Sequence, residues 1–102
     1  MLPGSVECHR AAIETACRDA GVRGLWLFGS ATRPDFRPGQ SDFDFLVELT
    51  PGRNAAAQFF PLYRTLASLF DERIDLISLA GVKNEIFAAE LQRTRVPVYV
   101  AA

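Results

Sequence analysis

The chain has 102 residues, 49% of them hydrophobic, and a formal net charge of -1 at pH 7. This length suits one domain spanning residues 1–102, with enough apolar residues for a core that needs no disulfides. The near-neutral charge excludes a general attraction for duplex nucleic acid or for anionic membranes.

Helical spacing of apolar residues predicts a first helix that begins at residues 3–5 and ends at Gly21. An apolar strand is predicted at residues 22–28, and a loop rich in glycine, proline and serine follows it at 29–40. A second strand is predicted at 43–49, and a second helix begins at 53–54, in which Pro61 either falls in the first turns or kinks the helix. A third strand at 73–79 and a third helix at 83–93 precede a short last strand at 96–100. The order α-β-β-α-β-α-β predicts an α/β (α+β) fold in which helices flank one small mixed sheet.

The last strand contains Pro97, which lacks an amide donor, so we expect this strand at an edge of the sheet. Large apolar side chains are numerous for so short a chain, and most of them are expected in the core, with a partner surface as the alternative. They are Trp26, Phe59, Phe60, Tyr63, Phe70 and Phe87.

The chain has two cysteines and one histidine, His9. Cys8 and Cys17 both fall in the first predicted helix, where nine residues span roughly 13 Å, well beyond the Cα separation of a disulfide. We therefore expect free thiols and a cytoplasmic location. The N-terminus has no apolar signal-peptide core, and no apolar run approaches the ~20 residues of a membrane span.

Two carboxylates, Asp42 and Asp44, stand where the second strand begins. Because side chains alternate along a strand, both point to one face, while Phe43 and Phe45 anchor the other face in the core. Carboxylates this close repel each other, and a hard cation such as Mg²⁺ resolves the repulsion. Asp75, in the third strand, joins them if that strand lies beside the second. Three carboxylates can hold two metal ions ~3.5–4 Å apart for phosphoryl or nucleotidyl transfer.

A phosphate site is predicted where the first strand ends. Gly29 lets the backbone approach a ligand closely, Ser30 offers a hydroxyl and an amide, and Arg33 can reach the same anion. Neither a Walker P-loop nor a GxGxxG fingerprint is present. Each feature alone is weak, since Gly-Ser occurs in many loops and Asp-x-Asp is usually a solvated strand end. Their combination in this order is specific.

The residues "FGSATR" and "SDFDFLVEL" with the later Asp75 resemble the minimal nucleotidyltransferases (MNT) of the DNA polymerase β-like superfamily. In that family an apolar strand, Gly-Ser, a loop with arginine, Asp-x-Asp and a later aspartate occur in this order. Pro34 stands where family members frequently have glycine.

The resemblance implies a nucleotidyltransferase fold, ATP as substrate and two Mg²⁺ ions. Asp42, Asp44 and Asp75 would be the catalytic and metal-binding residues, and Gly29, Ser30 and Arg33 would bind the nucleotide. Small members of the family are commonly paired with HEPN toxins, so we expect an antitoxin that transfers AMP to a tyrosine of a HEPN partner (AMPylation). The acceptor site would come from that partner or from a second copy in a homodimer. Two alternatives stay open: an adenylyltransferase for small molecules such as aminoglycosides, and a non-catalytic antitoxin that acts by binding.

Overall fold

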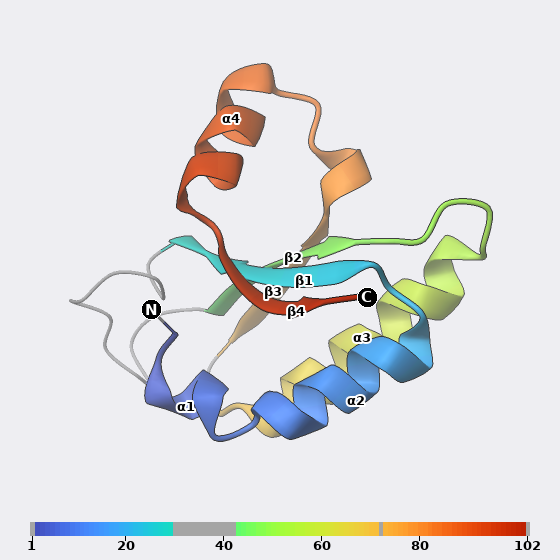
Figure 1. Cartoon of the computed structure of the whole chain (residues 1–102), viewed down its shortest axis with the longest axis vertical. Helices are drawn as coiled ribbons and strands as arrows, with labels where there is room; N and C mark the ends of the chain where they lie inside the picture. Colours follow the sequence, from blue (N-terminus) through green and yellow to red (C-terminus); the bar gives the residue numbers. More distant parts are fainter. Residues whose placement is uncertain (1, 30–42, 72, 102) are drawn as a thin grey trace.

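The structure of the chain, a computed structural model, describes residues 2–29, 43–71 and 73–101. In this part of the chain, helices cover both faces of a four-stranded sheet (Figure 1). The elements are α1 (Gly4–Glu7), α2 (Arg10–Ala20), β1 (Gly24–Phe28), β2 (Phe43–Glu48), α3 (Ala55–Leu69), β3 (Ile74–Ser78), the 3-10 helix η2 (Leu79–Gly81), α4 (Glu85–Thr94) and β4 (Val96–Val100).

The sheet is mixed and has the order β3-β2-β1-β4. Strand β1 pairs antiparallel with both β2 and β4, while β2 and β3 run parallel. The predicted mixed sheet flanked by helices is therefore confirmed, and β4, which contains Pro97, lies at an edge as expected. The end of β1 and the starts of β2 and β3 meet at one end of the sheet.

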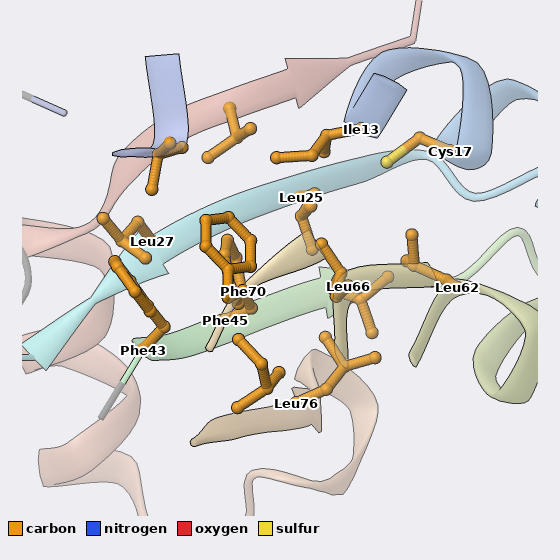
Figure 2. Close-up of a cluster of buried hydrophobic side chains, with 14 of the residues drawn as sticks. Ile13, Cys17, Leu25, Leu27, Phe43, Phe45, Leu62, Leu66, Phe70 and Leu76 are labelled. Atoms are coloured by element: carbon orange, nitrogen blue, oxygen red, sulfur yellow. The ribbon is translucent and has the colours of Figure 1, made fainter. Parts of the chain in front are cut away.

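The main core lies between the sheet and α1, α2 and α3, which Figure 1 shows together on one side. Figure 2 shows side chains from β1, β2 and β3 converging with those of α2 and α3. Phe43 and Phe45 of β2 are fully buried there and pack around Phe70. Among the described residues the cluster has fifteen buried members: Val6, Ile13, Cys17, Val22, Leu25, Leu27, Phe43, Phe45, Val47, Leu62, Leu66, Phe70, Ile74, Leu76 and Val98.

The opposite face of the sheet carries α4 and a smaller apolar cluster, in which the buried members are Trp26, Leu46 and Leu91. The Trp26 ring lies over Gly24, where a Cβ atom would come within 2.4 Å of the ring. The guanidinium carbon of Arg95 lies 4.2 Å from the centroid of the same ring, a cation–π contact. Since α4 is held by few buried side chains, this face has room for a functional site.

Hydrogen bonds fix the loop that connects β2 to α3. The side chain of Gln58, which is buried, accepts from the Thr50 amide at 2.8 Å and donates to the Thr50 carbonyl at 3.2 Å. The Thr50 hydroxyl donates to the Gly21 carbonyl at 2.6 Å. Asn54 caps α3 by accepting from the Ala57 amide. The end of the sheet away from Asp44 and Asp75 is thus closed by polar contacts.

The first predicted helix is in fact two helices. It breaks at Cys8 and His9, and α2 then ends at Gly21 in the left-handed conformation (φ 80°), as predicted. Cys8 therefore lies between helices rather than within one, and both cysteines are free. Among the helices in the described ranges, none has the length and apolar character to cross a membrane.

The prediction that most of the large aromatic side chains fill the core holds in part for Phe59, which packs against the main core, and is wrong for three others in α3 and α4. Phe60, Tyr63 and Phe87 are exposed, with exposed fractions of 53%, 39% and 41%. The reason is that α3 buries one narrow stripe, Gln58, Leu62 and Leu66, at i, i+4 and i+8. Trp26 and Phe70 are buried as expected.

Candidate functional site

Asp44 and Asp75 lie side by side at the end of the sheet where β2 and β3 begin. They are register partners in the parallel β2–β3 pair, so their backbones are one strand spacing apart, about 4.8 Å. Their neighbours Phe43, Phe45 and Ile74 are buried on the core face. Both carboxylates therefore belong to the α4 face, where Asp44 is half-buried and Asp75 is exposed.

Gly29 follows β1 and lies directly against the carboxylate of Asp44. Phe28 pairs with Asp44 across the β1–β2 ladder, and Gly29 then turns with φ 75°. A Cβ atom at Gly29 would lie 2.6 Å from Asp44 Oδ2, which is closer than atoms can approach. Glycine is thus required here for two reasons: the left-handed backbone and the space that the carboxylate occupies.

The structure brings three of the six predicted site residues into one row, Gly29, Asp44 and Asp75, across three neighbouring strands. The other three, Ser30, Arg33 and Asp42, lie outside the described residues. The predicted juxtaposition of Asp75 with the second strand is therefore confirmed at Asp44, and the place of Asp42 stays a prediction.

The described part of the row fits a hard divalent cation. Carboxylate oxygens are the donors that Mg²⁺ prefers, and Asp44 and Asp75 supply them from adjacent strands. The Gly29 backbone leaves the Asp44 carboxylate a space that any side chain would fill. Among the described residues no group of three or more His, Cys, Asp or Glu side chains is placed for a metal ion. Asp42, the predicted third donor, lies outside the described residues.

A cavity of about 390 Å³ opens beside Gly29, between β1 and α4. Phe28 and Phe87 line it, and their rings pack edge to face with centroids 6.3 Å apart. Arg93 also lines it, and its guanidinium forms an ion pair with Glu90 at 2.7 Å. Because both side chains are exposed, this ion pair contributes little to stability. In the sequence Arg93 looks like an ordinary solvated helix residue, so the pattern alone gave no signal for it.

Comparison with known proteins agrees with this geometry. Residues 10–93 match the family described as "Nucleotidyltransferase domain". The chain belongs to that family. No curated protein matches it.

Among solved structures, the chain is similar to one described as a candidate minimal nucleotidyltransferase. The two share 27% identity with a TM-score of 0.77, over 95% of this chain and 96% of that chain. A toxin–antitoxin structure with AMP-PNP gives 21% identity and a TM-score of 0.68, over 90% of this chain and 73% of that chain. A structure of a tri-AMPylated HEPN toxin from Shewanella oneidensis in complex with an MNT antitoxin gives 19% identity and a TM-score of 0.64, over 94% of this chain and 73% of that chain. The chain thus has the nucleotidyltransferase fold that MNT antitoxins share.

Proposed function

We propose that the chain is a Mg²⁺-dependent nucleotidyltransferase that transfers AMP from ATP to a tyrosine hydroxyl of a HEPN-type toxin and so acts as its antitoxin. The observation that carries the proposal is the row of Gly29, Asp44 and Asp75, in a chain of the nucleotidyltransferase family. The partner and the acceptor are suggested by the shared fold with MNT antitoxins, one of which is bound to an AMPylated HEPN toxin.

Each residue of the row has a part in the proposed reaction. The triphosphate approaches the Gly29 backbone, which carries no side chain to obstruct it. Asp44, together with the predicted Asp42, would hold Mg²⁺ against the phosphates. Bound Mg²⁺ supplies charge neutralisation on the transferred phosphate and on the leaving pyrophosphate.

The transfer itself is an in-line displacement. The acceptor oxygen forms a bond to the α-phosphorus of ATP while the bond from that phosphorus to the bridging oxygen breaks, and pyrophosphate leaves with the electron pair. Asp75, the carboxylate on β3, accepts the proton of the acceptor hydroxyl. Its exposure lets a large acceptor reach it.

The decisive experiment purifies the tagged chain from its native host with whatever protein is bound, adds ATP and MgCl₂, and records intact masses. We expect a bound protein to gain mass in steps of one AMP, and peptide mapping to place the AMP on tyrosine. The Asp42→Asn/Asp44→Asn double variant should bind the same protein without modifying it.

Asp19→Asn is the matched control, because Asp19 is an exposed aspartate of α2 on the far side of the sheet. This control should transfer AMP as the wild type does. A bound partner that never gains mass, with no nucleotide binding by the chain, would favour an antitoxin that acts by contact alone. Mg²⁺-dependent nucleotide binding without any protein partner would favour a small-molecule acceptor.

A further inference from the structure

A second cavity, of about 540 Å³, lies beside β3 at the opposite side of the row from the Gly29 cavity. Leu76 and Ile77 line it, although Leu76 packs in the main core and Ile77 packs with the α4-side cluster. Consecutive residues of a strand point to opposite faces, so a cavity that touches both must curve around the edge of the sheet. Strand β3 is that edge. We name this cavity the β3-edge groove.

The walls of the β3-edge groove come from three further elements. Phe59 of α3 contributes on the core side. On the other side, Gly81 at the end of η2, Val82 directly after it and Phe87 of α4 contribute. In Figure 1 the segment that follows β3 and α4 both lie on the side of the sheet opposite α1, α2 and α3. The exposed aromatic side chain of Phe87, which the core does not need, thus serves as a wall of this groove and of the Gly29 cavity.

The position of the groove follows from the geometry of the proposed transfer, on which this inference rests. In an in-line displacement, the attacking oxygen and the leaving group lie on opposite sides of the phosphorus. The triphosphate is placed at Gly29, after β1, and the sheet order puts Asp44 and then Asp75 further along the row. The acceptor must therefore enter from beyond Asp75, where β3 and its groove lie.

The chemistry of the groove distinguishes among acceptors. Its walls are mainly apolar, and of the described residues that line it none is acidic, while the one charged side chain is Lys83. A polycationic small molecule such as an aminoglycoside would find no counter-charge there. The groove instead suits an apolar side chain of a protein segment whose neighbouring residues are neutral or acidic. The edge of β3 also offers main-chain groups with which an extended peptide can pair.

We infer that the β3-edge groove is the acceptor site and that it binds an extended segment of the partner protein, with an apolar side chain of that segment in the groove. Asp75 and Ile77 are two residues apart on the same face of β3, about 6.6 Å along the strand. A segment lying beside β3 with its tyrosine at Asp75 presents the residue two positions away at Ile77. The acceptor tyrosine therefore has an apolar residue two positions before or after it.

Gly81 allows a clean test because it lines the groove and a side chain can be added there without a clash. A Cβ atom at Gly81 meets no atom within 4 Å, and the backbone is not in the left-handed region. We expect the series Gly81→Ala, Gly81→Leu and Gly81→Trp to lower AMP transfer to the partner progressively. For Gly81→Trp, kcat/KM for the partner should fall at least about tenfold, while ATP affinity, measured by calorimetry with Mg²⁺, should stay within about twofold.

Gly4→Trp is the matched control, since Gly4 in α1 also has open space around it and lies on the other side of the sheet. Gly4→Trp should transfer AMP like the wild type. The melting temperatures of both tryptophan variants should match that of the wild type. Full transfer by Gly81→Trp would overturn the groove assignment and leave the proposed function intact. Weaker ATP binding by Gly81→Trp would overturn it too, because the groove would then hold the nucleotide. If the wild type modifies no protein, both the proposed function and the groove assignment fail.

Discussion

The two faces of the sheet differ in how much of their surface is given to packing. On the side of α1, α2 and α3, buried side chains of the described residues form one continuous cluster, most of which Figure 2 draws. On the side of α4, the smaller cluster has three buried members among the described residues. The rest of this face carries the carboxylates and the Gly29 cavity, and the β3-edge groove curves onto it around the edge of the sheet. Adjacent residues of β2 belong to opposite faces of the sheet: Asp44 faces α4, and Phe45 faces the core. With the proposed function, the comparison predicts that stability depends mainly on one face and activity on the other.

The largest effect is expected from Asp44→Asn, which tests the α4 face. Removing one negative charge where Mg²⁺ and triphosphate meet should cost several kcal/mol of transition-state stabilisation, so AMP transfer should fall roughly a thousandfold or more. The melting temperature should change little, because the side chain is half-buried outside the core cluster. The measurement is transfer rate together with a thermal melt. A large loss of melting temperature would contradict the division between the faces.

Phe45→Ala, one residue further along the strand, should do the reverse. Phe45 is fully buried, and truncating a core phenylalanine costs about 3–5 kcal/mol. That is a large part of the 5–15 kcal/mol typical of a whole domain. Urea unfolding should show the loss, while transfer per folded molecule at low temperature should stay near the wild-type value. Normal unfolding with lost activity would place Phe45 in the site.

Gly29→Ala should lower both stability and activity, and a control variant with the same backbone cost separates the two effects. Left-handed backbone disfavours alanine by about 1–3 kcal/mol, and a Cβ atom would also displace the Asp44 carboxylate, 2.6 Å away. Gly52→Ala carries the same backbone cost (φ 79°) with no atom within 4 Å. Both variants should melt at lower temperature, but only Gly29→Ala should lose transfer activity, by about tenfold or more. Equal activities would show that Asp44 tolerates the shift.

The smallest expected effect is a difference in reactivity between the two thiols, which involves no change in stability or activity. Burial, with a smaller contribution from Glu14, raises the pKa of Cys17 to about 12. At pH 7–9, well below that value, Cys17 stays a protonated and unreactive thiol. A thiol reagent should therefore label the exposed Cys8 alone in the folded protein, and both cysteines in urea. Labelling of native Cys17 that increases between pH 7 and 9 would show that the core face opens.

The sequence predicted most of the fold, because the strands have clear patterns and turn residues bound them. The alternation around Asp44 correctly assigned its face, and Gly21 correctly ended the first helical region. The break at Cys8 and His9 was missed because neither residue is a helix breaker. The exposed aromatic side chains of α3 were missed because composition suggested a core, whereas α3 fully buries only the stripe through Gln58, Leu62 and Leu66.

The candidate site was predicted in part. Gly29, Asp44 and Asp75 were identified from motif order, but their adjacency depends on β3 pairing with β2, which local patterns do not determine. The β3-edge groove could not be predicted at all. It is formed by residues of α3, β3, α4 and the segment between β3 and α4, which are individually ordinary, such as Phe59 and Val82.

The placement of Trp26 gives the chain a built-in optical reporter. It is the single tryptophan in the sequence, and its ring lies between Gly24 and the guanidinium of Arg95 on the α4 face. Its fluorescence therefore follows the environment under α4, whereas far-UV circular dichroism follows all of the helices together. If the thinly packed α4 layer loosens before the core, the emission spectrum will shift at lower denaturant than the dichroism signal. The wild-type protein can thus report the behaviour of its functional face without any label.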